Sequence, residues 1–182
     1  MRMNAEVPSR IANLSATLIK ADGRRIELGF VKEPWYVRLQ RFFHFPVLLL
    51  VTDAGLTFLA NNFTGETSDV STFKYHDSGV GTTAAAQTDT VLQTQSGPTT
   101  RATGVNTVTQ NASGTGSTTP AIVQSVGTIA YVSSLAITEW GLFNQAAQGG
   151  TMWDHRIFSA INVVSGDSIQ FTYSLSLPGG GS

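Results

Sequence analysis

The clearest strand signal in the sequence is SIQFTYSLSL, residues 168–177. Every second position carries an apolar side chain (Ile169, Phe171, Tyr173, Leu175 and Leu177), and serine, glutamine or threonine fills the positions between. A period of two places the apolar set on one face of a β-strand and the polar set on the other. Strands with one buried and one polar face are typical of antiparallel sheets, because buried parallel strands are apolar throughout.

Further strand-length stretches precede this one and are separated by turn residues: AIVQSVGTIAYV (121–132), LAITEWGLF (135–143) and TMWDHRIFSAINVV (151–164). Residues 11–31 predict an N-terminal β-hairpin that turns at Asp22-Gly23. Its alternating apolar residues are Leu14, Ala16 and Leu18 before the turn and Ile26, Leu28 and Phe30 after it. Short strands at this spacing predict an all-β protein, either an antiparallel β-sandwich or a barrel.

One short helix is predicted around residues 53–63. Thr52 or Asp53 can cap its start, and Gly65 can end it. Its apolar residues fall on one face: Leu56, Leu59, Ala60 and Phe63. We therefore divide the chain into residues 1–50, an N-terminal hairpin and a basic, aromatic arm, and residues 51–182, a sandwich-like domain. That domain includes a Thr/Ser/Gly-rich loop at 94–119, and part of this region should pair as a strand because β-branched residues are frequent in it.

Composition excludes several classes of protein. Charged residues make up only 13% of the chain, about half the usual share, which suits a protein docked in an assembly. A net charge of −1 argues against a dedicated nucleic-acid binder. The most apolar run, FFHFPVLLLV (42–51), is too short to span a membrane, and we find no signal peptide for secretion. There are no cysteines, so disulfides and thiolate chemistry are excluded.

The stretch YHDSGVGTTAAAQTDTVL (75–92) contains a G-x-G-x-x-A run at Gly79, Gly81 and Ala84. A dinucleotide-binding turn needs a helix after the glycines and an acidic residue about 20 positions further on. The residues that follow are too rich in threonine for a helix, and the sequence near position 100 has no acid. We interpret the run as a structural turn. Gly79 and Gly81 are expected to adopt backbone angles that a Cβ forbids, and Asp89 to bond local backbone.

Two doublets, His76-Asp77 and Asp154-His155, could supply metal ligands. Adjacent side chains of a strand point to opposite faces, so neither doublet can close a tetrahedral site by itself. A site built across strands from His76, His155 and a carboxylate stays open as an alternative. Because no nucleophile elbow, P-loop or carboxylate cluster occurs, the sequence predicts no enzyme, no cofactor and no resident metal.

Aromatic and basic residues beside Pro34 form a candidate protein interface, since exposed aromatic and arginine side chains are typical contact anchors. They are Trp35, Tyr36, Arg38, Arg41, Phe42, Phe43 and Phe45. Trp140, within the alternating LAITEWGLF, is instead predicted to belong to the core.

Three stretches resemble a family of small virion proteins of tailed double-stranded DNA bacteriophages: FKYHDSGVGTTAAAQTDTVL (73–92), RATG (101–104) and the run from AITEWGLF to QFTYSLSL (136–177). The family shows a K-Y-H-x-x-G-x-G-T-T-A…D-T-x-L loop, an I-T-E-x-G-L/I-F strand and a last strand like GDSIQFTY. The resemblance covers roughly residues 50–177, and it implies no catalytic residue.

The resemblance implies a non-enzymatic structural role in the virion. We expect a capsid cement or decoration protein, a homo-oligomer with a trimer favoured, that contacts the major capsid protein or other virion proteins. Strands like I-T-E-x-G-L-F also occur in tail-fibre and baseplate proteins, so a tail, baseplate or head–tail connector component is the second expectation. A receptor-binding or carbohydrate-binding module that uses the Thr-rich loop is the third.

Overall fold

The computed structural model of this chain describes residues 12–30, 51–65, 69–96, 100–110 and 121–177. All seven candidate interface residues, from Trp35 to Phe45, fall outside these ranges. The predictions made for that segment therefore stay predictions.

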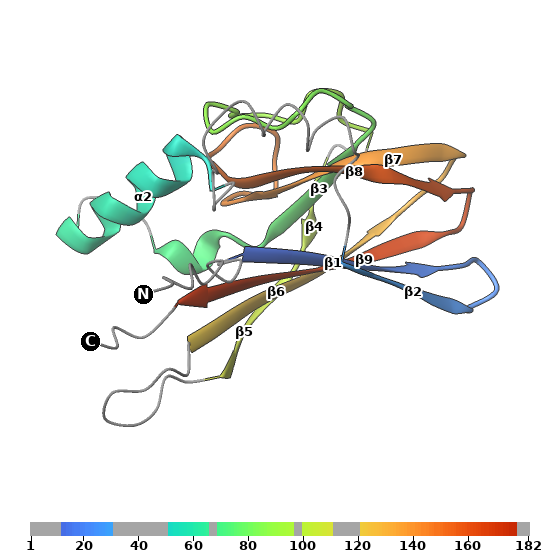
Figure 1. The fold of residues 1–182 in the computed structure, drawn as a ribbon, viewed down its shortest axis with the longest axis horizontal. Coiled ribbons are helices and arrows are strands. Elements are labelled where there is room, and N and C mark those ends of the chain that lie inside the picture. The colour runs from blue at the N-terminus through green and yellow to red at the C-terminus, as the bar shows by residue number, and fades with distance from the viewer. Residues whose placement is uncertain (1–11, 31–50, 66–68, 97–99, 111–120, 178–182) are drawn as a thin grey trace, which may run out of the picture.

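Two antiparallel sheets face each other in a β-sandwich (Figure 1). Sheet A has the strand order β2-β1-β9-β6-β5 and contains β1 (Ala12–Ile19), β2 (Arg25–Phe30), β5 (Val105–Gln110), β6 (Ala121–Ala130) and β9 (Ser168–Leu177). Sheet B has the order β4-β3-β7-β8 and contains β3 (Tyr75–Gly79), β4 (Ala102–Thr103), β7 (Leu135–Phe143) and β8 (Met152–Val163). The predicted all-β sandwich is confirmed, and the sheets do not close into a barrel.

The stretch with the clearest alternation, β9, lies at the centre of sheet A. It pairs with β1 on one side (Leu14 opposite Tyr173) and with β6 on the other (Ser125 opposite Tyr173). Its apolar side chains Ile169, Phe171 and Tyr173 are buried between the sheets, as their alternation with polar residues predicted. The predicted hairpin belongs to this sheet, since β1 pairs with β9 along its whole length.

The core lies between the two sheets. Trp140 on β7 is fully buried there, as predicted, with its ring 6.2 Å from that of Phe171 and 5.6 Å from that of Tyr173. Ile137, Phe158 and several residues of β1 belong to the same cluster. Burying one large apolar side chain contributes about 1.5–3 kcal/mol, so this layer supplies most of the favourable free energy of folding.

Two predicted apolar faces are more open than expected. Ile26 and Leu28 on β2 are 43% and 40% exposed, because β2 is an edge strand paired only with β1 and lacks the cover that sheet B gives its neighbours. The helix α2 (Asp53–Thr64) begins at the Thr52 cap and ends at Gly65, as predicted. It packs through Gly55 against Trp153 and then extends beyond the sheets (Figure 1), which leaves Phe63 83% exposed.

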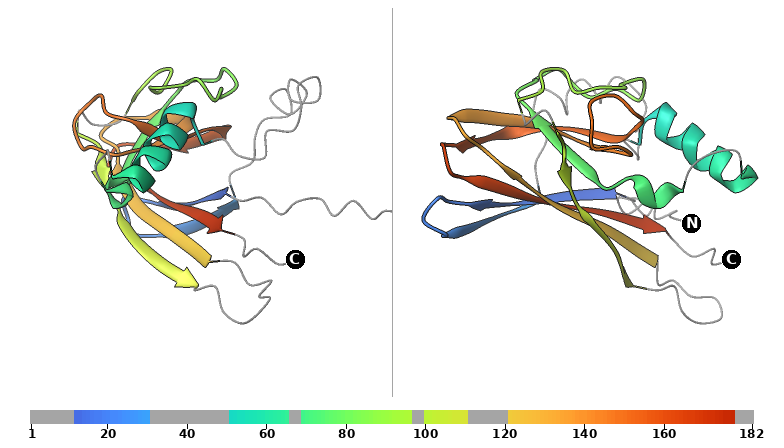
Figure 2. Two further views of the ribbon diagram at one scale, coloured as in Figure 1. Left: turned by 90° about the vertical axis from the view of Figure 1, so that its left-hand side faces the viewer. Right: turned by 180° about the vertical axis from the view of Figure 1, so that it is seen from behind.

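A third layer covers the outer face of sheet B (Figure 2). Residues 80–96, which we call the 80–96 loop, lie across this face. The backbone N–H of Ser96 donates to the carbonyl of Ser78 on β3, and the N–H of Val80 donates to the carbonyl of Thr94, which ties the two limbs of the loop together. A small second core of Leu92, Phe143 and Met152 lies beneath the loop. Sheet B is therefore buried on both faces beneath the loop, whereas Ala136, Ala160 and Asn162 at its other end are exposed. No helix among the described residues is long and apolar enough to cross a membrane.

Candidate functional site

The carboxylate of Glu139 on β7 holds the 80–96 loop in place. Its two oxygens accept backbone N–H bonds from Gly81 (2.9 Å), Gln93 (2.9 Å) and Thr94 (2.8 Å). Adjacent side chains of a strand point to opposite faces, so the Glu139 carboxylate faces the loop while Trp140 faces the core. The pairing of β7 with β8 shifts between Ile137 and Glu139, and this irregularity lets Ile137 face the core together with Trp140. One buried side chain thus fastens both limbs of the loop to the sheet.

His155 on β8 completes this cluster. Its Nε2 lies 3.1 Å from an oxygen of Glu139, and its Nδ1 lies 2.7 Å from Oδ2 of Asp89 in the loop. A carboxylate only accepts hydrogen bonds, so the ring donates through both nitrogens and is an imidazolium. Asp89 also accepts a bond from the backbone N–H of Ala86, which is the local bond that the sequence predicted.

The environment of each group favours its charged form. Burial by itself lowers the pKa of His155, but hydrogen bonds to Glu139 and Asp89 outweigh it and raise the pKa above the ordinary 6.5. Burial by itself raises the pKa of Glu139, but His155 and the three backbone N–H groups lower it below the ordinary 4.5. Both pKa shifts favour an ionised Glu139–His155 pair beneath the loop.

Gly79 and Gly81 are needed for a different reason from the one predicted. Neither has a positive φ, so the expectation of backbone angles forbidden to a Cβ was wrong. The reason is close approach. A Cβ on Gly81 would lie 2.7 Å from Oε1 of Glu139 and 2.7 Å from Gln93, and one on Gly79 would overlap Glu139 and the carbonyl of Thr94. The glycines let the backbone reach the buried carboxylate.

His76 on β3 faces the opposite side of sheet B, toward the core. The indole N–H of Trp140 donates to its Nδ1 (3.2 Å), so the ring carries its proton on Nε2 and donates to Oγ of Ser125 on β6 (3.0 Å). Burial lowers the pKa of His76 to about 3, and the ring is neutral. His76 and His155 thus lie on different faces, and the cross-strand metal site left open by the sequence is not formed. No cluster of three potential metal ligands occurs within the described ranges.

Asp77, next to His76, points to the other face and meets Arg101. The guanidinium Nε lies 3.3 Å from Oδ2 of Asp77, and both side chains are buried. Nη1 of Arg101 donates to the carbonyl oxygens of Gln145, Ala147 and Gly149, at 2.8–3.0 Å. The guanidinium also lies 3.5 Å from the ring centre of Phe143. Arg101 therefore fastens residues 144–150 to sheet B, as Glu139 fastens the 80–96 loop.

Sequence reasoning assigned no role to Glu139 or Arg101. A signal for Glu139 was present, because it is the single charged residue of the apolar strand LAITEWGLF. A charge buried in a strand must find a partner or pay a large desolvation cost. Arg101 offered a similar signal, since Asp89 and Arg101 are the two charged residues between positions 78 and 119.

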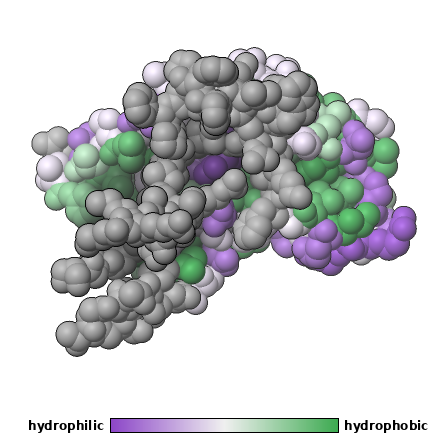
Figure 3. Space-filling model, in the orientation of Figure 1, coloured by the Kyte–Doolittle hydropathy of each residue, from purple (hydrophilic) through white to green (hydrophobic). Residues whose placement is uncertain are grey.

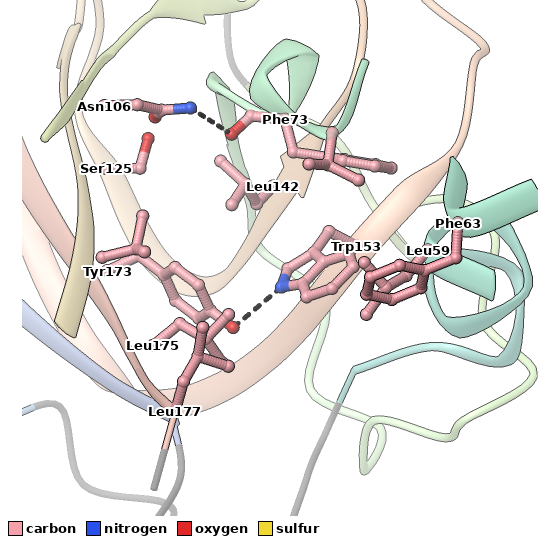
Figure 4. A pocket seen from close by; sticks show the side chains of 12 residues that line it. Leu59, Phe63, Phe73, Asn106, Ser125, Leu142, Trp153, Tyr173, Leu175 and Leu177 are labelled. Carbon is pink, nitrogen blue, oxygen red and sulfur yellow. Dashed lines mark hydrogen bonds between the residues drawn. The ribbon is translucent and has the colours of Figure 1, made fainter. Parts of the chain in front are cut away.

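A cavity of about 260 Å³ opens at the end of the sandwich beside α2 (Figure 4). Its walls are mostly apolar and include Leu59, Phe73, Leu142, Trp153, Tyr173 and Leu175. The indole N–H of Trp153 donates to the hydroxyl of Tyr173 (2.9 Å). Two polar side chains, Asn106 and Ser125, lie together at one end of this lining (Figure 4).

The described residues thus present two local features, buried charges that hold loops on sheet B and an apolar cavity beside the helix. Comparisons with protein-family models, with curated proteins and with solved structures find no match to this chain.

Proposed function

We propose that the protein is a non-enzymatic structural protein of a phage virion, most specifically a capsid cement or decoration protein. The observation that carries the proposal is that the buried ionisable side chains of its motifs bond the protein's own loops. Glu139, His155 and Arg101 are buried, and each makes hydrogen bonds to the loop that it holds. General acid–base catalysis needs such groups within reach of a substrate, whereas these face the protein itself.

The outer face of sheet A supports the same proposal. β1, β5, β6 and β9 contain no Lys, Arg, Asp or Glu. Their outward side chains are mostly small and polar. Ser15 pairs with Thr172 across β1 and β9, and Ser174 on β9 lies between Asn13 on β1 and Gln124 on β6. The cores of protein interfaces are depleted in charged residues, so this face suits permanent contact with a neighbour.

Cement proteins act by binding the assembled state. A protein that binds only the closed lattice stabilises it by mass action, without any chemical step. A rigid sandwich with fastened loops suits this task, because little conformational entropy is lost when preorganised surfaces dock. A homotrimer that contacts the major capsid protein is the form we favour.

A tail, baseplate or head–tail connector role is the second proposal, because I-T-E-x-G-L-F strands resemble parts of tail fibres and baseplates as well. A receptor-binding or carbohydrate-binding module is the third. These proposals differ from the first in the number of copies that a particle carries.

The copy number tests the proposal. Purified virions are separated by gel electrophoresis, and the band of this protein is quantified against the major capsid protein. We expect hundreds of copies per particle, whereas tail parts with closed rotational symmetry number about three to twelve. A count in the low tens or below would eliminate the cement role.

A further inference from the structure

The cavity beside α2 is large enough to hold an aromatic ring with substituents. Its volume is about 260 Å³, and an engineered apolar cavity of about 150 Å³ already binds benzene. Apolar side chains continue from the lining to the surface, since Phe63 is 83% and Leu177 48% exposed. Figure 3 shows this apolar surface over α2, where the helix leaves the sandwich.

A hydrogen-bond acceptor in the lining lacks a donor. The side-chain NH₂ of Asn106 donates to the carbonyls of Ser71 (3.1 Å) and Phe73 (3.3 Å), and these two bonds set the orientation of the amide. Its carbonyl oxygen, Oδ1, is buried and has no hydrogen-bond partner within the described part of the chain. Buried acceptors are nearly always paired in native proteins, so this one indicates a missing donor.

The hydroxyl of Ser125 is a second polar group in this lining. Ser125 accepts the Nε2–H of His76, whose tautomer is set by Trp140, so the serine hydroxyl keeps its own hydrogen to donate. Ser125 and Asn106 occupy the same end of the cavity (Figure 4). A single hydroxyl group placed there satisfies both, because it accepts from Ser125 and donates to Oδ1 of Asn106.

We propose that the cavity binds the side chain of a tyrosine presented by a partner protein. The phenol ring lies among the rings of Phe73, Trp153 and Tyr173, and its hydroxyl bonds Asn106 and Ser125. The apolar rim is the reason for choosing a protein over a free phenol, since it offers contact to the residues that flank an anchoring tyrosine. This inference rests on the proposed function, in which the partner is a neighbouring virion protein.

The test compares two model ligands on the purified full chain. N-acetyltyrosinamide and N-acetylphenylalaninamide differ by one hydroxyl, and binding is followed by NMR through the indole N–H signal of Trp153. We expect the tyrosine derivative to bind about tenfold more tightly, the factor that corresponds to one net hydrogen bond. Asn106→Leu should remove this preference and still bind the phenylalanine derivative.

Asn13→Leu on the outer face of sheet A is the matched control, and it should keep the preference. Ser125→Ala removes the donor without adding volume, so it tests the site even if Asn106→Leu fails to fold. Equal binding of the two derivatives by the wild type, or no binding of either, would overturn the proposal.

A further ligand separates the two sources of a phenol. If 4-methylphenol binds and N-acetyltyrosinamide does not, the cavity takes a free phenol and the assignment to a partner's tyrosine is wrong. These titrations need no particles, so a low copy number in the virion would end the cement role and leave the result on the cavity unchanged.

Discussion

The outer faces of the two sheets differ in how their polar side chains are satisfied. The outer face of sheet B carries Asp77, Glu139 and His155, and loops cover it completely at these positions. The outer face of sheet A carries mainly serine, threonine, glutamine and asparagine on β1, β5, β6 and β9, which contain no charged residue, and most of these side chains are half-buried or exposed. Its charged residues, Arg25 and Glu27, lie on the edge strand β2. A charge buried in a strand requires a covering loop that supplies its hydrogen-bond partners, whereas a hydroxyl or amide can face water at little cost.

The largest expected effect comes from removing the charge at the centre of the covered face. Glu139→Ala leaves three backbone N–H groups and the His155 imidazolium without their acceptor, and we expect a loss of about 3–5 kcal/mol in the free energy of unfolding. Denaturant titration measures this loss. Glu27→Ala on the exposed edge of sheet A is the matched control, and it should cost less than about 1 kcal/mol. Equal costs for the two variants would contradict the comparison.

A smaller effect is expected where the loop approaches the sheet. Gly81→Ala places a Cβ 2.7 Å from Glu139 and Gln93, so the loop must shift away from the carboxylate. We expect a cost of about 1–3 kcal/mol, the range for overpacked sites. Ala86→Ser, at an exposed position of the same loop, should stay within about 0.5 kcal/mol of the wild type. If both variants unfold at the same denaturant concentration, close approach is not what requires this glycine.

The third prediction concerns pH and uses the two histidines on opposite faces of sheet B. The pKa of His155 is raised in the folded state, so its contribution to stability is complete below pH 6.5 and is lost as the pH rises through the folded pKa. The pKa of His76 is lowered to about 3, so its contribution is complete above pH 6.5 and is lost as the pH falls toward 3.

His155→Gln should therefore flatten the alkaline side of the stability profile and leave the acidic side in place. Urea unfolding between pH 5 and pH 9 measures both sides, and the ¹⁵N shifts of the wild type should show His155 protonated on both nitrogens at pH 6. Identical profiles above pH 6.5 for the variant and the wild type would mean that the imidazolium does not stabilise the loop.

Most elements could be predicted from local patterns. The strands LAITEWGLF and SIQFTYSLSL, the hairpin turn at Gly23 and the capped helix all lie where the sequence placed them, because alternation, turn residues and caps act within a few positions of the chain. The site was predicted only in part. Gly79, Gly81 and Asp89 were identified as structural, but the residue that holds their loop, Glu139, lies 58 positions after Gly81.

The sequence alone determined which residues form strands and which face of each strand is apolar, because side-chain period and turn chemistry are local properties. Only the tertiary structure decided which faces are covered. Ile26 is exposed because β2 lies at an edge, and Glu139 is buried because a distant loop folds over it. Burial depends on contacts between residues far apart in the chain, and no local pattern encodes which of them meet.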